Sequence, residues 1–322
     1  MDQYSILLYY CYTKIEDPQQ FREDHHFYCL DLDLRGRIIV ATEGLNGTVS
    51  GLRHHCETYM DHVKSDPRFG DIEFKVEPYH QHAFQKLNVR VKPEIVNVGL
   101  PHIDPTRQTG EYVEPEELEA FMDQQDVVML DVRSNYEHKL GKFKGAITLD
   151  MENFREFPQK LPELESLKDK TIVTYCTGGI KCEKASSFLL EAGFENVYQL
   201  HGGIIKYGLE AGGKDFDGKC YVFDNRISAP VNRVNPTILS RCYICDAGCD
   251  RMINCANPTC NKHLPICLTC GEKLQGACST VCQQHPEKRP YNGTGYYQKE
   301  LNGYNPYRGI RRNSSNTFSE TN

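Results

Sequence analysis

The sequence has no long apolar run, no basic leader and no excess of positive charge. None of its hydrophobic stretches approaches the roughly 20 residues that span a bilayer, and its first residues contain neither a basic region nor a small-residue cleavage site. We therefore expect no membrane anchor and no signal peptide, and a cytoplasmic location in which thiols stay reduced. The net charge of −7 argues against a surface coated with positive charge, although a local basic patch would suffice to bind nucleic acid.

The sequence also lacks the glycine-rich fingerprint of a dinucleotide-binding loop. Its nearest candidate, GLNGTVSG at residues 44–51, does not have the required spacing. We therefore expect neither a flavin nor a nicotinamide cofactor. Otherwise the composition is that of an ordinary globular protein, since 39% of the residues are hydrophobic and 25% are charged, and a chain of 322 residues has room for two or three domains.

Cysteine, by contrast, is abundant and unevenly distributed. Nine of the 15 cysteines fall between Cys242 and Cys282, in a stretch with almost no hydrophobic periodicity. In a long cytosolic chain such crowding indicates metal binding before disulfides. Four other cysteines are isolated and are expected to be small buried or indifferent residues. These four are Cys11, Cys29, Cys56 and Cys220.

Eight of the crowded cysteines form four pairs. Two pairs have the C-x₂-C spacing and two are looser, and each pair can supply two of the four ligands of a tetrahedral zinc site. The order of the pairs permits an interleaved arrangement, first with third and second with fourth, which would hold two structural zinc ions. Cys249 and His263 would be spare or substitute ligands, and the alternatives are reduced thiols without metal or iron–sulfur binding. The eight predicted ligands are Cys242, Cys245, Cys255, Cys260, Cys267, Cys270, Cys278 and Cys282.

Residues 1–95 have the pattern of a ferredoxin-like (acylphosphatase-like) domain. Strand and helix patterns follow in the order β-α-β-β-α-β, which predicts two helices on a four-stranded antiparallel sheet. The first helix opens with Asp17 as its N-cap and Pro18 at its first position. The two central strands are expected to meet in a tight turn at residues 45–47, because Asn-Gly favours hairpins. Contact with RNA is the alternative role of residues 43–47.

The rest of the chain divides into four segments. Residues 113–215 alternate strands with helices, which predicts a parallel sheet with helices on both faces. Pro and Gly make residues 96–112 a linker. Residues 216–285 form the cysteine-rich segment, and the polar residues 286–322 are expected to be a mobile tail. The predicted fold class is therefore a multidomain α/β and α+β protein.

The segment TYCTGGIKCEKAS, residues 174–186, places a cysteine at the end of a buried strand, before a glycine-containing loop and a helix. Ligands of parallel α/β sheets bind beyond the carboxyl ends of the strands. Backbone N–H groups at the helix start would form an anion cradle that favours a thiolate and lowers the pKa of Cys176. The alternative is a buried strand-end cysteine beside a tight turn. The active-site loop is expected to contain Thr177, Gly178, Gly179, Ile180 and Lys181.

Three stretches combine basic and aromatic residues, a pattern that suits unpaired nucleotides such as an anticodon loop. They are the Cys176 loop, the run from Lys86 to Lys92 and the C-terminal tail, and a solvated surface is the alternative for each. The candidate RNA-binding residues are Lys86, Arg90, Lys92 and Lys181, to which the tail adds Tyr304, Tyr307, Arg308, Arg311 and Arg312.

Residues 129–150, 174–194 and 197–208 resemble a rhodanese domain. They contain a DVR strand, a Gly-Ala pair, a six-residue loop led by Cys176 and a closing Gly-Gly turn. The resemblance implies that Cys176 can carry a persulfide surrounded by backbone amides. One departure is the sequence GKF before the Gly-Ala pair, where the family usually has a histidine. The matching residues are Asp131-Val132-Arg133, Gly145-Ala146, Cys176 to Lys181 and Gly202-Gly203.

The wider combination of motifs resembles the bacterial tRNA uridine hydroxylase family. It joins residues 36–51, residues 84–99, the Cys176 loop and the cysteine-rich segment in this order. The resemblance implies O₂-dependent conversion of the wobble uridine of tRNA to 5-hydroxyuridine, with both Cys176 and Cys182 implicated in activity. The alternatives are a thiosulfate or persulfide sulfurtransferase and a non-catalytic RNA-binding protein. The sequence specifies neither the electron source nor the oligomeric state.

The chemistry of uracil is compatible with a reactive thiol. A thiolate can add to C6, which builds enolate character at C5 and lets C5 take oxygen from an O₂-derived electrophile. We expect Cys176 to activate the base in this way or to carry the oxidising equivalent, and Cys182 to resolve the resulting sulfenate or disulfide. Packing at the helix start is the alternative role of Cys182. Asp131, together with an ion pair between Arg133 and Glu137, is expected to support the pocket. Direct contact of Arg133 and Glu137 with the substrate is the alternative.

Overall fold

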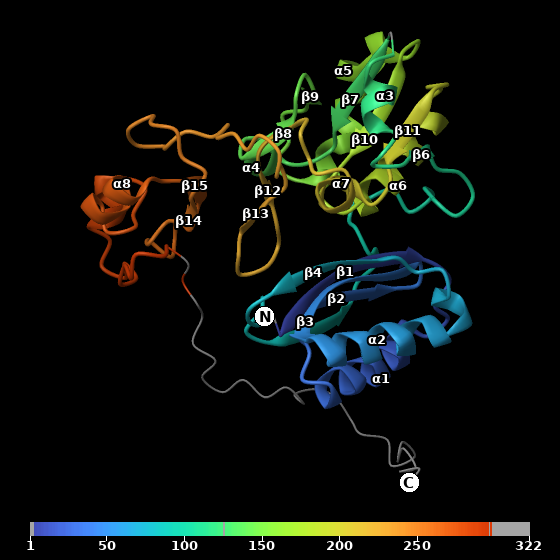
Figure 1. Cartoon of the computed structure of the whole chain (residues 1–322), viewed down its shortest axis with the longest axis horizontal. Helices are drawn as coiled ribbons and strands as arrows, with labels where there is room; N and C mark the ends of the chain where they lie inside the picture. The colour runs from blue at the N-terminus through green and yellow to red at the C-terminus, as the bar shows by residue number, and fades with distance from the viewer. Residues whose placement is uncertain (1–2, 125, 296, 298–322) are drawn as a thin grey trace. The chain divides into compact units, whose positions relative to one another are not determined.

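The structure is a computed structural model that describes residues 3–124, 126–295 and 297 (Figure 1). The chain forms two compact units, which divide between Ile95 and Val96. The second unit contains both the rhodanese-like part and the cysteine-rich segment. Within the described residues, no helix is long and apolar enough to cross a membrane.

The first unit is a five-stranded sheet with two helices packed on one of its faces (Figure 1). Its strand order is β4-β1-β3-β2-β5, and the first four strands have the predicted ferredoxin-like arrangement. The sequence does not predict β5, which pairs in parallel with β2 at the edge of the sheet. The elements are β1 (Tyr4–Tyr12), α1 (Pro18–Asp31), β2 (Arg35–Ala41), β3 (Gly44–Leu52), α2 (Arg53–Ser65), the 3₁₀ helix η1 (Pro67–Phe69), β4 (Phe74–Tyr79) and β5 (Leu87–Val91).

The hairpin that joins β2 to β3 turns at Thr42 and Glu43, so the turn predicted at residues 45–47 is wrong. The Asn-Gly pair lies inside β3 instead. There Gly47 faces Tyr9 of β1, and a Cβ atom on Gly47 would lie 2.2 Å from the Tyr9 hydroxyl oxygen. Glycine is required at this position for close packing against a distant strand, which a local turn signal does not reveal.

Two side chains of this hairpin region hold the end of the first unit. The backbone N–H of Ile95 donates to Glu43 Oε1 over 2.7 Å, and Asn46 Nδ2 donates to the carbonyl oxygen of Ile95 over 2.9 Å. Ile95 is the residue after which the chain passes into the second unit. These hydrogen bonds give Glu43 and Asn46 a structural role, so their presence can be explained without a contact with RNA.

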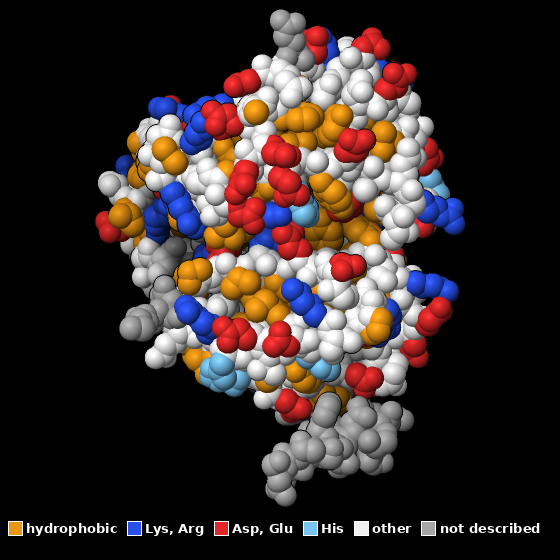
Figure 2. All heavy atoms as spheres, turned by 45° about the vertical axis from the view of Figure 1, so that its right-hand side comes forward, with side chains coloured by type: hydrophobic (Ala, Val, Ile, Leu, Met, Phe, Trp, Pro, Cys, Tyr) orange, Lys and Arg blue, Asp and Glu red, His pale blue; other side chains and the backbone are white. Residues whose placement is uncertain are grey.

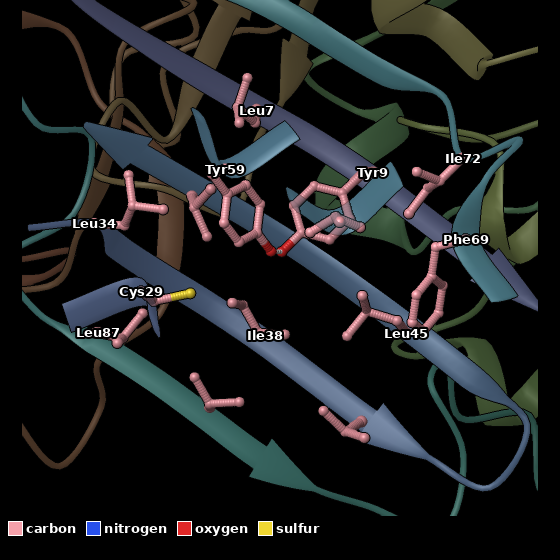
Figure 3. Close-up of a cluster of buried hydrophobic side chains, with 14 of the residues drawn as sticks. Leu7, Tyr9, Cys29, Leu34, Ile38, Leu45, Tyr59, Phe69, Ile72 and Leu87 are labelled. Atoms are coloured by element: carbon pink, nitrogen blue, oxygen red, sulfur yellow. Dashed lines mark hydrogen bonds between the residues drawn. The ribbon is translucent and has the colours of Figure 1, made fainter. Parts of the chain in front are cut away.

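The core of the first unit lies between the sheet and its helices (Figure 3). At its centre the hydroxyl groups of Tyr9 and Tyr59 are hydrogen-bonded, and His25 Nε2 lies 2.8 Å from the Tyr59 hydroxyl. Helix α1 begins where the sequence predicts, with Asp17 accepting hydrogen bonds as N-cap and Pro18 in the first turn. The start of α1 fixes which of its side chains face the sheet, and His25 is one of those that enter this core.

The second unit contains the predicted parallel sheet, with the strand order β6-β11-β10-β7-β9. All four pairings in it are parallel. The loop that follows the central strand, β10, therefore leaves from the middle of the sheet. The strands are β6 (Glu111–Val113), β7 (Val127–Asp131), β9 (Ile147–Thr148), β10 (Thr171–Tyr175) and β11 (Val197–Leu200). The helices are α3 (Leu118–Met122), α4 (Asn135–His138), η2 (Phe154–Lys160), α5 (Leu161–Leu164), η3 (Glu165–Leu167), α6 (Ile180–Glu191) and α7 (Gly203–Glu210).

Residues 96–112, the predicted linker, pack closely on the second unit. Val98 is buried in the same apolar core as Cys176 and Cys182. The N–H of Gly110 donates to Ser186 Oγ of α6 over 2.8 Å. The segment thus connects the units and also supports the helix that follows the reactive-cysteine loop.

A smaller antiparallel sheet, β13-β12-β8, joins the rhodanese-like part to the segment that follows it. Its strand β8 is the GKF sequence, and Phe143 of that strand pairs with Phe216 of β12. Beyond this sheet the cysteine-rich segment has only short elements. The remaining elements are β8 (Gly141–Phe143), β12 (Phe216–Tyr221), β13 (Ser228–Pro230), β14 (Met252–Asn254), β15 (His263–Pro265), α8 (Leu268–Lys273) and α9 (Thr280–Gln283).

The first part of the predicted mobile tail is held to the cysteine-rich segment. The N–H of Arg289 donates to the carbonyl oxygen of Ala256 over 3.0 Å, and Arg251 Nη2 donates to the Tyr291 hydroxyl over 2.7 Å. These hydrogen bonds attach Arg289 and Tyr291 to the cysteine-rich segment, and the mobility of residues 286–322 stays a prediction. The tail candidates Tyr304, Tyr307, Arg308, Arg311 and Arg312 lie outside the described residues.

Candidate active site and metal centres

Cys176 follows β10 directly, at the carboxyl end of the central strand of the parallel sheet. The loop after it ends at Gly179, which is the N-cap of α6. The N–H of Gly179 donates to Cys176 Sγ over 3.2 Å, and Cys176 is 1% exposed. The sulfur thus occupies a sheltered position at a helix N-terminus, where N–H groups stabilise an anion.

The Gly-Gly turn before α7 supports the same loop. The N–H groups of Ile204 and Ile205 donate to the carbonyl oxygens of Cys176 and Thr177, each over 3.0 Å. Gly203 makes this approach possible, because it has a φ of +67° and a Cβ there would lie 2.5 Å from the Cys176 oxygen. The start of α7 therefore fixes the backbone of the loop.

Cys176 at the start of the loop and Cys182 in α6 have opposite acid–base behaviour. Burial acts to raise the pKa of Cys176, but a hydrogen bond from Cys182, the charge of Lys181 and the N–H groups of Lys181 and Gly178 together lower it to about 6. Burial and the neighbouring Cys176 raise the pKa of Cys182 well above its ordinary value. At neutral pH the pair is therefore a Cys176 thiolate beside a Cys182 thiol.

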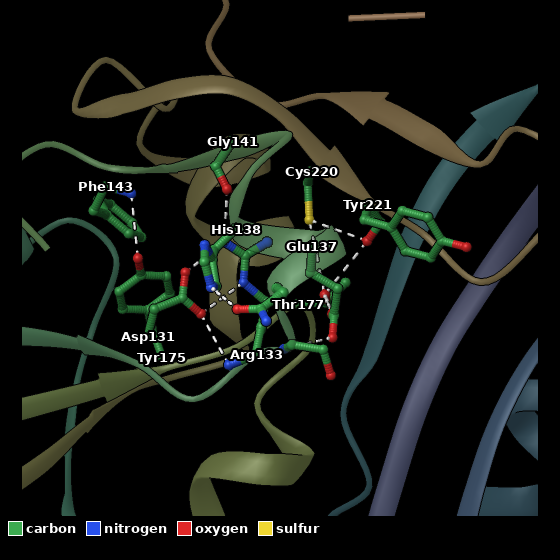
Figure 4. Close-up of polar contacts among 12 residues, drawn as sticks. Asp131, Arg133, Glu137, His138, Gly141, Phe143, Tyr175, Thr177, Cys220 and Tyr221 are labelled. Atoms are coloured by element: carbon green, nitrogen blue, oxygen red, sulfur yellow. Dashed lines mark hydrogen bonds and ion pairs between the residues drawn. The ribbon is translucent and has the colours of Figure 1, made fainter. Parts of the chain in front are cut away.

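Lys181 and Glu137 form an ion pair beside the loop. Lys181 Nζ lies 2.7 Å from Glu137 Oε2, and the two side chains are 13% and 0% exposed. Glu137 belongs to the capping box of α4, where its Oε2 also accepts from the N–H of Ser134 over 3.1 Å. Its other oxygen lies 3.4 Å from the Thr177 hydroxyl (Figure 4). Glu137 therefore fixes both the cation and the first loop residue to α4.

Asp131 and Arg133 form a separate ion pair that is fully buried (Figure 4). Arg133 donates from Nε to Asp131 Oδ1 over 2.9 Å and from Nη2 to Oδ2 over 2.6 Å. Nη2 also donates to the carbonyl oxygen of Gly141 in β8 over 2.7 Å. The expected pair between Arg133 and Glu137 is therefore wrong. Each side chain braces the site with a different partner, because the strand end turns Arg133 back toward Asp131.

A third cysteine lies next to the loop. Cys220 of β12 is fully buried, and its Sγ lies 3.9 Å from Thr177 Oγ1 and 3.5 Å from the carbonyl oxygen of Tyr221 (Figure 4). The sequence marks Cys220 only as an isolated residue. Its position depends on the pairing of β12 with β8, which no local pattern indicates.

The eight cysteines predicted as metal ligands gather in two sets. Within each set the four sulfur atoms lie within 4.8 Å of one another. A zinc ion with tetrahedral Zn–S bonds of about 2.3 Å needs sulfurs about 3.8 Å apart, and the neighbouring sulfurs Cys245–Cys267 and Cys260–Cys278 lie 3.8 Å and 3.7 Å apart. The sets join the first pair with the third and the second with the fourth, which is the predicted interleaving: Cys242, Cys245, Cys267 and Cys270, and Cys255, Cys260, Cys278 and Cys282.

The two residues considered as spare ligands lie outside these sets. His263 Nδ1 lies 2.7 Å from the hydroxyl of Tyr221, and Cys249 Sγ lies 3.9 Å from the carbonyl oxygen of Arg251. His263 is thus engaged with β12, and four sulfurs already complete each set. Both sets can hold a metal ion without either residue.

The candidate RNA-binding residues belong to different units. Lys86, Arg90 and Lys92 are exposed along or beside the edge strand β5 of the first unit, whereas Lys181 belongs to the second unit and is paired with Glu137. On the face shown in Figure 2, acidic and basic side chains are interspersed, in agreement with the net charge of −7. Contact with RNA would therefore depend on local groups of residues.

Comparison with known proteins extends over nearly the whole chain. Family models match residues 4–95 (UPF0176 acylphosphatase like domain), 114–210 (Rhodanese-like domain) and 217–283 (Rhodanase C-terminal). A Cytophaga hutchinsonii protein named tRNA uridine(34) hydroxylase is 65% identical over 312 residues, which cover 97% of this chain and 100% of that protein. A Bacillus licheniformis protein of the same name is 50% identical, over 74% of this chain and 76% of its own.

A solved structure is also similar over part of the chain. The rhodanese-like domain of an Anabaena protein is 25% identical over 34% of this chain and 80% of its own, with a TM-score of 0.29. The match to the Cytophaga protein covers 97% of this chain and therefore extends over both units.

Proposed function

The chain belongs to the tRNA uridine(34) hydroxylase family, and we propose that it hydroxylates C5 of the wobble uridine of tRNA with O₂ as the oxygen donor. The observation that carries this proposal is the pair of cysteines in one cradle, a Cys176 thiolate beside a Cys182 thiol. Sulfur transfer needs one thiol. Insertion of one oxygen atom of O₂ needs two electrons besides, and a pair of thiols can supply them as it forms a disulfide.

Cys176 is the nucleophile of the proposed reaction. Its thiolate adds to C6 of the uracil ring, and C5 becomes an enolate carbon that attacks O₂. The outer oxygen of the new peroxide then takes up a proton. The product is a hydroperoxide on C5, with C6 still bonded to Cys176. The N–H of Gly179 and the charge of Lys181 keep the sulfur ionised before the attack.

Cys182 completes the electron balance. Its sulfur takes the outer oxygen of the hydroperoxide, which leaves a hydroxyl group on C5 and a sulfenic acid on Cys182. Loss of the C5 proton expels the Cys176 thiolate and restores the C5–C6 double bond. Cys176 then condenses with the sulfenic acid to a disulfide and water. One oxygen atom thus enters the uridine, the other becomes water, and an external dithiol must reduce the disulfide before the next cycle.

Access to Cys176 sets a condition on the substrate. Because Cys176 is 1% exposed, side chains over the loop must move before a base reaches Sγ. A base of the anticodon loop is unpaired, so it enters such a site without being extracted from a duplex. This substrate also predicts that the protein works in the cytoplasm.

The two cysteine sets fit zinc in a structural role. Each would hold one ion through four thiolates, which leave no open coordination position for substrate. The ions would supply cross-links to a segment whose own helices and strands are short. We therefore assign no step of the reaction to them.

Nucleoside mass spectrometry of tRNA tests the proposal. Cells that lack the gene would be complemented with wild type, Cys176→Ala, Cys182→Ser or the control Cys11→Ser, whose cysteine lies in the other unit. We expect wild type and the control to restore 5-hydroxyuridine and its derivatives. Cys176→Ala and Cys182→Ser should both fail to restore them. Full restoration by Cys182→Ser would contradict the role of Cys182 as the thiol that takes the outer oxygen of the hydroperoxide.

A second readout separates hydroxylation from sulfur transfer. After one turnover in air without reductant, peptide mapping of the wild type should show a disulfide between Cys176 and Cys182. If deletion of the gene leaves the modified nucleosides unchanged, and purified protein moves sulfur from thiosulfate through Cys176 alone, the protein is a sulfurtransferase and the proposal fails.

A further inference from the structure

A cavity lies beside the reactive-cysteine loop, between the rhodanese-like part and the cysteine-rich segment of the second unit. Its volume is about 730 Å³, within the range of about 300–1,000 Å³ that is typical of ligand pockets. Its walls come from α4, the end of β12 and the strand β15 with its neighbours. The lining residues used below are Tyr136, Lys139, Tyr221, Phe223, Lys262 and His263.

Aromatic rings form one wall of this cavity. The rings of Tyr136 and Tyr221 lie 4.9 Å apart, and those of Tyr221 and Phe223 lie 5.2 Å apart, both edge to face. The hydroxyl of Tyr221 is held by His263 Nδ1 over 2.7 Å. Phe223 is 43% exposed, so part of its ring is accessible to a ligand. Accessible aromatic rings of this kind stack on unpaired bases.

Two lysines supply positive charge at the same cavity. Lys139 and Lys262 are both exposed, and no ion pair with either occurs among the described residues. The acidic group of the lining is Glu152, whose Oε1 accepts from Asn135 Nδ2 over 3.1 Å. The lining therefore contains two cations and one acid, and the acid is already hydrogen-bonded. The cavity consequently attracts phosphate groups.

The aromatic wall is connected to the reactive loop. The Thr177 hydroxyl lies 3.4 Å from the carbonyl oxygen of Tyr221, and Lys181 Nζ lies 5.8 Å from the centre of the Phe223 ring. A ligand stacked on Phe223 would therefore lie beside the cation that stabilises the Cys176 thiolate.

We propose that this cavity binds an unpaired nucleotide next to the uridine that reacts, with its base on Phe223 and its phosphates near Lys139 and Lys262. The inference rests on the proposed function, because it takes an anticodon loop as the substrate. It adds a binding site for a neighbouring nucleotide to the reactive loop itself. The site would explain how the enzyme holds the loop of the RNA while the target base enters the buried cradle.

Binding of an anticodon stem-loop RNA to the full chain tests the site. Fluorescence anisotropy at several salt concentrations would compare wild type with Phe223→Ala and with the double variant Lys139→Met/Lys262→Met. Tyr243→Ala and Lys168→Met are the matched controls, since Tyr243 is exposed outside the cavity and Lys168 forms a surface ion pair with Glu165.

Each variant has a distinct expected result. Phe223→Ala should weaken binding at least about fivefold at every salt concentration, because it removes one stacked base. The double lysine variant should reduce the slope of log K against log salt by about 1.4, the value for two lost phosphate contacts on a single strand. The controls should match wild type. Equal affinities and equal slopes in all five proteins would overturn the proposal.

Failure of the cavity can be distinguished from failure of the function. Cys176→Ser should lose 5-hydroxyuridine formation but bind the stem-loop as wild type does. If the wild type makes 5-hydroxyuridine while the cavity variants bind RNA normally, only the cavity proposal fails. If the cavity variants lose RNA affinity but the wild type makes no 5-hydroxyuridine, the hydroxylase proposal fails and the RNA site stands.

Discussion

The low pKa of Cys176 makes the charge of Lys181 a direct target for a test. Lys181→Met removes the ammonium group and keeps a long apolar side chain, while the N–H donors of the loop remain. We expect the pKa of Cys176 to rise from about 6 by roughly one pH unit, the lower end of the effect of a nearby opposite charge. Glu137→Gln should act in the opposite direction, because it leaves the charge of Lys181 without its partner.

The midpoint of the pH profile measures this change better than a rate at one pH. With a pKa of about 6, a thiol is about nine-tenths ionised at about pH 7, whereas at the ordinary value of about 8.5 only about 3% is thiolate. This gain of roughly 30-fold in thiolate is offset by about a tenfold loss of intrinsic nucleophilicity, because a Brønsted coefficient of about 0.4–0.5 applies. The net advantage near neutral pH is then only about threefold.

Brief alkylation with iodoacetamide across a range of pH, read by mass spectrometry of the peptide that contains Cys176, gives the midpoint for each protein. Lys168→Met is the control, since Lys168 pairs with Glu165 on the surface and does not contact the loop. The order of midpoints should be Glu137→Gln lowest, then wild type with the control, then Lys181→Met. A wild-type midpoint near 8.5, the ordinary thiol value, would refute the thiolate cradle. Equal midpoints for wild type and both variants would refute the role of Lys181.

Three further predictions concern stability and metal content. Gly203→Ala should lower the free energy of unfolding by about 1–2 kcal/mol in thermal unfolding. It should also lower activity, because its Cβ would lie 2.5 Å from the Cys176 carbonyl oxygen. Gly193→Ala, also at positive φ but with nothing within 4 Å, should lose stability and keep its activity. Cys242→Ser and Cys255→Ser should each reduce bound zinc from about two ions to about one in plasma mass spectrometry, since each removes a ligand from a different set; loss of both ions from either variant would contradict two independent sites. Burial lowers the pKa of His25 to about 3, so below about pH 6.5 the unfolded chain binds a proton that the folded chain does not, and the free energy of unfolding should fall by up to about 1.4 kcal/mol per pH unit down to about pH 3. His25→Gln should flatten this fall in denaturant titrations, and an unchanged slope would contradict the assignment.

Sequence patterns predict those parts of the fold whose determinants lie close together along the chain. Asp17 and Pro18 start α1 through contacts within one turn, so a local pattern is sufficient. The turn predicted between β2 and β3 is wrong because the Asn-Gly pair serves packing inside β3 and not the turn. Gly47 makes room for the ring of Tyr9, on a strand that only the folded sheet brings beside it. The same limit hides β5, which is short and gains its place by pairing with β2.

The candidate site follows the same division. The loop from Cys176 to Lys181 is contiguous, and so its cradle can be inferred from residue types and from the strand before it. The partners of its charged residues depend on the fold, and therefore the sequence places Arg133 with Glu137 where the structure pairs them with Asp131 and Lys181. The cysteine sets are an instructive exception, because four pairs along the chain have few ways to satisfy two tetrahedral ions.

The features of the loop that stabilise a persulfide anion also serve the attack on a uridine, since both use a sulfur anion surrounded by N–H donors. The cradle by itself therefore does not distinguish hydroxylation from sulfur transfer. Two features outside the six-residue loop do. Cys182 places a protonated thiol in contact with the thiolate, where it can reduce a hydroperoxide on the bound base, a step that sulfur transfer does not need. The cavity at Phe223 places an aromatic surface beside Lys181, where thiosulfate has no group to stack but a nucleotide has a base.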